Sequence, residues 1–203
     1  MKKALITGGS GFFGSILERR LLEEDFSVIN IDLVKDDFCH ENHTTIQGDI
    51  SDETLLKKVF EENRFDCVFH CAAILAHAVK DKQFLWESNV EGTRNVAEMA
   101  ARHNVKQLVF TSSNCLWAEN FHRPVLEDDV PNPVEIYGKS KLEGEKILLS
   151  YRDRVNSVII RCPTIMDAGR MGLLGILFEC IGTLTGCQDG RNTVFEVVFL
   201  RFI

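Results

Sequence analysis

The sequence lacks the run of about 20 apolar residues that a membrane-spanning helix needs. The segment 172–181 is an apolar helix candidate, but it is short and contains Glu179. The opening Met-Lys-Lys leads straight into a strand-like run, without the apolar core and cleavage site of a signal peptide. We therefore expect a cytoplasmic protein that does not bind a membrane.

A surplus of basic charge is missing as well. The 203 residues include 23 Lys and Arg against 30 Asp and Glu, a formal net charge of -7. Nucleic acids and anionic membranes attract basic surfaces, so neither is expected as a partner. The content of 45% hydrophobic and 26% charged residues is ordinary for a globular protein, which leaves small molecules and other proteins as partners.

The seven cysteines form no CxxC pair, and their number is odd. Several of them lie beside apolar runs, which is typical of buried reduced thiols rather than of a disulfide framework. His40 and His43 have no metal-binding partners of the right type near them in the sequence. No metal site is therefore predicted.

Strand-like and helix-like runs alternate along the chain. Hydrophobic patterns predict strands over 2–7, 28–32, 44–47, 67–71, 107–112 and 157–161, and helices after the first glycine loop, after a cap at Ser51 or Asp52, and over 87–103 and 134–151. Parallel strands need crossover connections, so this alternation predicts an α/β fold, a Rossmann-type doubly wound parallel sheet with helices on both faces. Ligands bind such sheets beyond the carboxyl ends of the strands.

A glycine loop follows the first predicted strand. Gly8, Gly11 and Gly14 have the spacing GxxGxxG between a strand and a helix, where backbone N–H groups can approach a pyrophosphate. Asp32 ends the second strand, where a carboxylate can accept hydrogen bonds from both adenosine ribose hydroxyls and would repel a 2′-phosphate. The loop and this acid predict a dinucleotide site that prefers NAD to NADP, although Lys35 lies close by.

A tyrosine and a lysine open the helix predicted over 134–151. Tyr137 and Lys141 are four residues apart and share a helix face, and an ammonium near a phenol favours the phenolate. Such a tyrosine can act as general base toward a substrate hydroxyl and as general acid in reverse. Ser112 and Ser113 end the fifth strand, and either hydroxyl could hold the reacting oxygen.

These motifs together resemble the extended short-chain dehydrogenase/reductase family, the NAD-dependent epimerase/dehydratase group. The matching segments are TGGSGFFG (7–14), Asp32, GDI (48–50), HCAA (70–73), NVEGTRN (89–95), TSS (111–113), YGKSK (137–141) and RCP (161–163). They cover nearly all of residues 1–165 in the expected order. Each motif is weak or moderate alone, and their order makes the resemblance specific.

The resemblance implies roles for further residues. Phe12 and Phe13 would contact the pyrophosphate through their backbone, and Ser113 fits the catalytic hydroxyl better than Ser112. The remaining roles are Asp49 and Ile50 at the adenine, Cys71, Ala72 and Ala73 along the cofactor, Asn89 near the active site in support of the lysine network, Lys141 at the nicotinamide ribose, and Pro163 beside the nicotinamide. Tyr137 and Asn89 also count among the cofactor-binding residues. Taken without the family, Asp49 reads more simply as a loop residue.

Family members normally continue into a smaller C-terminal lobe that binds the substrate. The resemblance therefore divides the chain into an NAD-binding domain over 1–170 and a remnant or truncated substrate-binding region over 171–203. The last segment, 193–203, is almost continuously apolar and β-branched or aromatic. It fits a final strand, an altered reading frame or a truncated end equally well.

The leading hypothesis is an NAD-dependent epimerase or dehydratase that acts on a nucleoside-diphosphate sugar through a transient keto-sugar. One alternative is a simple alcohol dehydrogenase of the same superfamily, such as a hydroxysteroid or sterol dehydrogenase. Another is a non-catalytic NAD-binding regulatory protein, which the short C-terminal region favours and the intact Ser113, Tyr137 and Lys141 disfavour. The resemblance also implies a possible homodimer through the helices near 87–103 and 134–151.

Overall fold

The computed structural model describes residues 1–76, 78–117, 123–163 and 165. Contacts between Cα atoms divide the chain into a unit over Met1–Arg161 and a second over Cys162–Ile203. The first unit contains every element discussed below, save the last residue of the final strand. The helix and strand expected after residue 170 lie outside the described residues, so the division at residue 170 stays a prediction.

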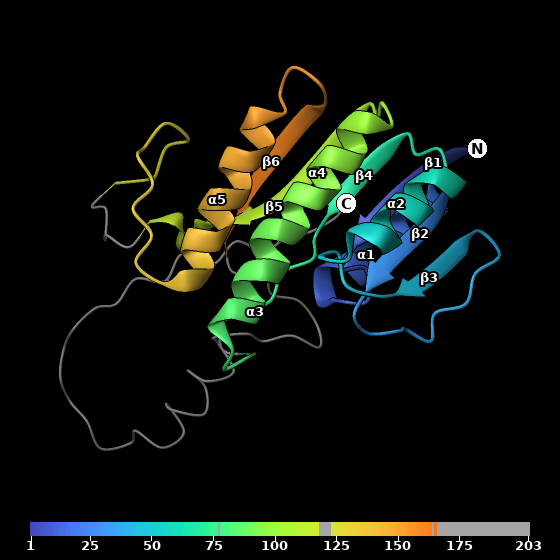
Figure 1. Cartoon of the computed structure of the whole chain (residues 1–203), viewed down its shortest axis with the longest axis horizontal. Coiled ribbons are helices and arrows are strands. Elements are labelled where there is room, and N and C mark those ends of the chain that lie inside the picture. The colour runs from blue at the N-terminus through green and yellow to red at the C-terminus, as the bar shows by residue number, and fades with distance from the viewer. Residues whose placement is uncertain (77, 118–122, 164, 166–203) are drawn as a thin grey trace. The chain divides into compact units, whose positions relative to one another are not determined.

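The strands form one six-stranded parallel sheet in the order β3-β2-β1-β4-β5-β6 (Figure 1). Parallel registers join β1 to β2 and β4, β2 to β3, and β4 to β5. The strands are β1 (Lys2–Thr7), β2 (Phe26–Asp32), β3 (His43–Gln47), β4 (Cys67–His70), β5 (Gln107–Ser113) and β6 (Asn156–Cys162). This is the strand order of the Rossmann fold, and it confirms the predicted fold class.

Helices connect most of the strands as crossovers, whereas β2 continues to β3 through residues 33–42 without a helix. The helices are α1 (Phe12–Glu23), α2 (Glu53–Glu62), α3 (Lys82–Trp86), α4 (Gly92–Arg102) and α5 (Ile136–Ser150), with a π-helical turn η1 (Glu87–Glu91) between α3 and α4 and a 3-10 turn η2 (Asn114–Leu116) after β5. None of the described helices combines the length and the apolar character needed to cross a bilayer.

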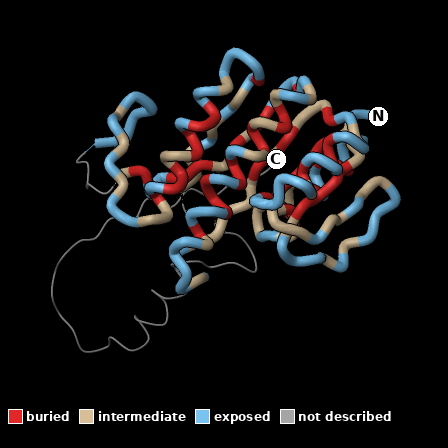
Figure 2. Tube along the Cα trace, viewed as in Figure 1, coloured by how far each residue is buried: buried red, intermediate tan, exposed pale blue. Residues whose placement is uncertain are grey.

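Side chains alternate between two apolar clusters, one on each face of the sheet. Ala4 and Ile6 of β1 face α1, together with Leu21 and Leu22 of that helix. Leu5 faces the other way, into the larger cluster with α2, α4 and α5. Figure 2 shows the buried residues gathered in the strands and on the inner sides of these helices. The inner strands β1, β2 and β4 are covered on both faces and are therefore rich in apolar residues, whereas the edge strands β3 and β6 are partly exposed.

The chain leaves the middle of the sheet in two directions. It runs from β1 to β2 and β3 on one side, and returns to place β4 and then β5 on the other. Thr7 and His70 are register partners at the carboxyl ends of β1 and β4. Diverging connections leave a crevice at such a switch point, which is where open α/β sheets bind ligands.

The helix predicted over 87–103 starts earlier and contains an irregularity. It begins with α3 because Asp81 caps the N-terminus, accepting hydrogen bonds from Gln83 N at 2.9 Å and Phe84 N at 3.1 Å. The π-helical turn η1 then interrupts the regular pattern before α4. Hydrophobic periodicity reports neither feature, because it follows the apolar face and not the backbone bonding.

The cap of α2 is Asp52 rather than Ser51. Its Oδ1 accepts hydrogen bonds from Thr54 N at 2.9 Å and Leu55 N at 3.1 Å. We expect Asp52→Ala to lower the free energy of unfolding by about 0.5–2 kcal/mol, since both amides lose their partner. Ser51→Ala is the matched control, because Ser51 forms its hydrogen bonds to Asp49 and Asn95 through its backbone. Urea unfolding measures both variants. If Ser51→Ala lowered the free energy of unfolding as much as Asp52→Ala does, the assignment of Asp52 as the cap would be wrong.

Candidate cofactor and active site

The glycine loop lies against the end of β4. Gly8 has a φ of +79°, and a Cβ placed there would lie 2.6 Å from the Cα of Ala72. Only glycine fits this close approach without strain. A Cβ at Gly14 would collide with the carbonyl oxygen of Gly8, so the helix also packs directly on the loop.

The N-terminus of α1 is suited to an anion. Its N-cap residue is Gly11, no side chain caps it, and its first turn contains no acidic residue. Amide dipoles at such a terminus favour a phosphate group, and the absence of bulk at Gly8 and Gly14 lets that group approach the backbone. This cradle fits the pyrophosphate of a dinucleotide.

Asp32 connects the end of β2 to the glycine loop. Its Oδ2 accepts a hydrogen bond from Ser10 N and its Oδ1 accepts one from Val34 N, each at 3.0 Å. Each carboxylate oxygen keeps acceptor capacity, so the same group can receive ribose hydroxyls. Leu33 and Val34 follow it as exposed apolar residues, and neither offers a positive charge to a 2′-phosphate.

Asp49 and Ile50 follow β3 and have different surroundings. Asp49 shapes the turn into α2, because its Oδ1 accepts a hydrogen bond from Ser51 N at 2.9 Å. Ile50 is 4% exposed and belongs to the larger core, against Gly92, where a Cβ would lie 2.6 Å from its Cγ1. Contact of either residue with adenine stays a prediction.

His70 links the end of β1 to the π-helical turn through a chain of hydrogen bonds. Its Nδ1 lies 2.6 Å from Thr7 Oγ1, and its Nε2 lies 2.8 Å from Thr93 Oγ1. The Thr93 hydroxyl donates to the Asn89 carbonyl oxygen at 2.6 Å, so it must accept from Nε2–H. Nδ1 is then the acceptor for the Thr7 hydroxyl, which also lies 3.5 Å from the backbone N of Ala72.

The imidazole of His70 is held neutral. Burial, and secondly the charge of Lys141, lower the pKa of His70 from its ordinary 6.5 to about 3. The side chain is fully buried and stacks on Phe110 with ring centroids 5.3 Å apart. A neutral ring has one donor and one acceptor, which is what the two flanking threonines require.

Asn89 anchors the connection that follows β4 to helix α5. Its Oδ1 accepts from Ile74 N at 2.7 Å, and its Nδ2 donates to Ile74 O at 3.0 Å and to Ser140 Oγ at 3.0 Å. Ser140 in turn donates to the backbone O of Tyr137 at 2.8 Å. Asn89 is therefore tied to the segment that carries Tyr137 and Lys141, and its support of the lysine's hydrogen-bond network stays a prediction.

Lys141 is buried beside Tyr137, as the spacing of four residues predicts. Its Nζ donates to the carbonyl oxygen of Thr111 at 2.8 Å, and it lies 4.7 Å from the ring centre of Phe110 and 5.9 Å from that of Tyr137. The side chain as a whole is 3% exposed. A buried ammonium ion at the end of β5 makes this corner of the sheet electropositive, the field that stabilises a phenolate.

The two serines at the end of β5 have different partners. Ser112 Oγ donates to Glu145 Oε1 at 2.5 Å, and Glu145 forms an ion pair with Arg161 at 2.8 Å. Ser113 Oγ accepts from Cys115 N at 3.1 Å and caps the turn η2. Successive side chains of a strand point to opposite faces, so Ser112 is committed to a structural network and Ser113 is the better candidate for the reacting oxygen.

Cys71, Ala72, Ala73 and Pro163 complete the set of residues predicted to bind the cofactor. Cys71 continues β4, its N donating to the carbonyl oxygen of Thr7 at 2.9 Å. Ala72 touches the glycine loop, as described above, and Ala73 follows it. Pro163 belongs to the second unit, so its expected place beside the nicotinamide stays a prediction.

Comparison with known proteins matches the profile of the NAD dependent epimerase/dehydratase family to residues 4–172. The chain belongs to this family. It is 34% identical over 202 residues to the uncharacterized protein y4nG of Sinorhizobium fredii, covering 98% of this chain and 50% of that protein. It is 31% identical over 195 residues to a UDP-glucose 4-epimerase of Neisseria meningitidis serogroup B, covering 86% of this chain and 56% of the epimerase.

A solved structure agrees with this membership. The enzyme WbmH of Bordetella bronchiseptica, crystallised in complex with NAD+, superposes with a TM-score of 0.81 at 28% identity, covering 92% of this chain and 64% of that one. The chain thus spans about half the length of the curated relatives it matches. The resemblance inferred from the motifs and the Rossmann-type fold are both confirmed.

Sequence reasoning assigned no role to His70, Thr93 or the Glu145–Arg161 pair. The position of His70, a polar residue at the end of an apolar strand, could have indicated its role. The pair of Glu145 and Arg161 leaves no local pattern, because its partners come from α5 and β6.

The low pKa of His70 predicts how stability changes with pH. As the pH falls, the His70 ring of the unfolded chain gains a proton near pH 6.5, whereas the ring of the folded chain gains one only near pH 3. The contribution of neutral His70 to the free energy of unfolding is therefore complete above pH 6.5 and falls as the pH drops toward 3. The loss is about 1.4 kcal/mol per pH unit within that window. Urea unfolding at pH 7.5 and 5.5 should show a smaller drop for His70→Gln than for the wild type. The exposed His40→Gln is the control, and equal drops in all three proteins would refute the assignment.

Proposed function

We propose that this chain binds NAD at the crevice between β1 and β4 and forms the cofactor-binding part of an epimerase or dehydratase. The observation that carries the proposal is the position of three groups at the carboxyl edge of one sheet. The Gly8 loop lies at β1, Asp32 at β2, and the buried Lys141 against the end of β5. NAD+ is also the cofactor named for the matching WbmH structure.

The chain's own groups account for a preference for NAD. The cradle at Gly8 and Gly14 would hold the pyrophosphate on the N-terminus of α1, and Asp32 would accept hydrogen bonds from the adenosine ribose. A second negative charge in place of the 2′-hydroxyl would meet the Asp32 carboxylate. Repulsion between like charges disfavours NADP.

A bound NAD would supply a reversible hydride acceptor. Tyr137 would take the proton from the sugar hydroxyl as its carbon loses hydride, leaving a carbonyl, and would return a proton when that carbonyl is reduced. Lys141 would stabilise the phenolate form between these steps. The Ser113 hydroxyl would hold the reacting oxygen.

The substrate class is proposed from the named relatives. UDP-glucose 4-epimerases recur among them, so a uridine-diphosphate hexose is the first substrate to test. We expect the purified chain with NAD to interconvert UDP-glucose and UDP-galactose. NMR of the anomeric protons measures this conversion. Stoichiometric release of NADH with a non-sugar alcohol would instead indicate a simple dehydrogenase. If no nucleotide sugar is converted and bound NAD is never reduced, the proposal fails.

Tyr137→Phe tests the proposed base directly. The change removes only the hydroxyl, so turnover should fall by about 10²–10⁴-fold while the affinity for NAD stays nearly unchanged. Tyr151→Phe is a matched control, because Tyr151 lies at the opposite end of α5 from Tyr137. There its hydroxyl donates to Glu98 at 2.7 Å. Turnover that survives in Tyr137→Phe would refute the mechanism.

The two serines should separate activity from stability. Ser113→Ala should lower turnover by about 10²-fold with little effect on unfolding, since a group that stabilises the reacting oxygen is lost. Ser112→Ala should lower the free energy of unfolding by about 1–3 kcal/mol, because the buried Glu145 loses a hydrogen bond. Kinetics and urea unfolding of both variants check the assignment, and a reversed pattern would make Ser112 the catalytic hydroxyl.

Two further expectations accompany this proposal. A homodimer would be formed through the helices near 87–103 and 134–151, and sedimentation of the purified protein tests it. The cytoplasmic location likewise remains a prediction.

A further inference from the structure

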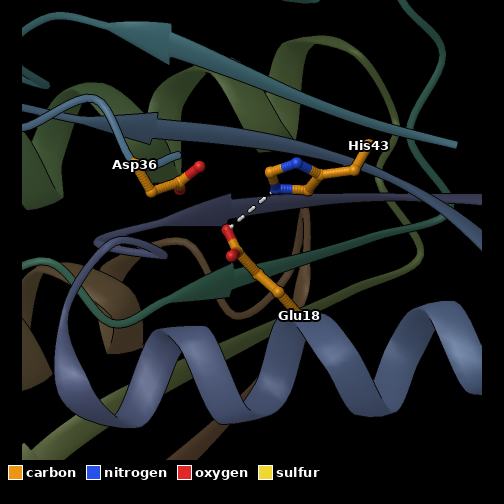
Figure 3. A group of neighbouring side chains, drawn as sticks. All are labelled: Glu18, Asp36 and His43. Carbon is orange, nitrogen blue, oxygen red and sulfur yellow. Dashed lines mark ion pairs between the residues drawn. The ribbon is translucent and has the colours of Figure 1, made fainter. Parts of the chain in front are cut away.

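Three potential metal ligands meet behind the glycine loop. Glu18 comes from α1, Asp36 from the connection after β2, and His43 from the first position of β3 (Figure 3). One ligand atom from each lies within 4.8 Å of the other two, the one such cluster of three found among the described residues. Figure 3 shows all three side chains pointing toward a common centre.

The two innermost ligand atoms are buried without hydrogen bonds. The side chains of Glu18 and His43 are each 2% exposed, and neither Glu18 Oε1 nor His43 Nε2 has a hydrogen-bond partner among the described groups. Burying a polar atom without a partner is costly, so such pairs are rare in folded proteins. Their nearest polar contact is the ion pair that they form with each other at 3.4 Å (Figure 3), a separation that leaves room for a cation between them.

The spacing of these two atoms fits a metal ion. Oε1 and Nε2 lie 3.4 Å apart, longer than a good hydrogen bond between them. Two ligand atoms about 2.1 Å from a tetrahedral zinc ion are separated by about 3.4 Å. The distance between Glu18 and His43 thus matches one edge of a tetrahedral site.

Surrounding groups orient the acidic ligand. Asp36 Oδ2 accepts hydrogen bonds from Thr45 Oγ1 at 3.0 Å, Ser10 Oγ at 3.1 Å and Asn30 Nδ2 at 3.3 Å. Its Oδ1 accepts from Phe38 N at 3.2 Å. Metal-binding carboxylates are typically held by such an outer layer of donors.

The histidine ligand is held by an aromatic contact. The Phe38 ring packs edge-on against the imidazole of His43, with centroids 5.1 Å apart, and His43 Nε2 lies 3.4 Å from Glu18 Oε1.

We propose that Glu18, Asp36 and His43 form a binding site for a divalent transition-metal ion, with Zn²⁺ as the best fit. One imidazole and two carboxylates suit zinc better than the oxygen-only ligand sets of Mg²⁺ and Ca²⁺. An ion can enter from a surface cavity of about 590 Å³, which Asp36, His43 and Thr45 help to line. A fourth position would be left for water.

The site would brace the cofactor loop from behind. A Cβ at Gly9 would collide with the Glu18 carboxylate, and Gly9 N donates to Asn30 Oδ1 at 2.8 Å. The Asn30 amide also reaches Asp36. An ion held here would therefore join α1, the glycine loop and the start of β3, so the role is structural and does not depend on the proposed enzymatic function.

Cobalt spectroscopy of the full chain provides the test. We expect one Co²⁺ per chain, with visible d–d bands of a tetrahedral nitrogen and oxygen site and without the near-ultraviolet thiolate band that a cysteine site would give. With Zn²⁺ at a hundredfold excess over its dissociation constant, Tm should rise by about 5–10 °C.

Two variants that keep a polar side chain and one control assign the ligands. Glu18→Gln and His43→Gln should each abolish the d–d bands and the Tm rise, and circular dichroism would verify that they fold. His40→Gln should keep both effects, because His40 lines the same cavity outside the cluster.

The proposal is overturned by any of three results. These are the absence of cobalt binding to the wild type, a thiolate band in its spectrum, or binding that survives in Glu18→Gln. The first result, together with a higher Tm for Glu18→Gln than for metal-free wild type, would show that a proton alone balances the cluster.

Discussion

The close contact between Gly8 and Ala72 is the constraint on which the rest of the site depends. No side chain fits between the two backbones, so β1 and β4 end at the same level and the glycine loop turns directly over that edge. His70 maintains this arrangement from within the sheet, through Thr7 on one side and Thr93 on the other. The chain of hydrogen bonds continues to Asn89 and so reaches the segment that carries the candidate catalytic groups.

Two electrostatic environments flank this centre. On the β5 side a buried ammonium ion lies beside a tyrosine ring, with a neutral histidine behind it. On the β2 side carboxylates gather around the loop, where Asp32 holds Ser10 and the proposed ion would offset Glu18 and Asp36. The carboxyl edge of the sheet therefore combines a positive corner at Lys141 with a negative one around Asp32 and Asp36.

Much of this organisation follows from local sequence. Apolar strands separated by periodic helices predict a parallel sheet, and the GxxGxxG spacing and the pair Tyr137 and Lys141 depend only on neighbours along the chain. The remaining features depend on contacts between distant segments. The π-helical turn, the tautomer of His70 and the different partners of Ser112 and Ser113 arise only when β1, β4, β5, α4 and α5 pack together. The buried position of Glu18 does have a local signal, because this charged residue shares the helix face of Leu21 and Leu22. That pattern does not identify its partners after β2.

We propose the switch point between β1 and β4 as the site for NAD. Calorimetric titration of the purified chain with NAD and with NADP measures both affinities. We expect saturable binding of one NAD per chain and an affinity for NADP lower by about tenfold or more, because Asp32 repels the 2′-phosphate. Failure to bind NAD, or equal affinity for the two dinucleotides, would rule this site out.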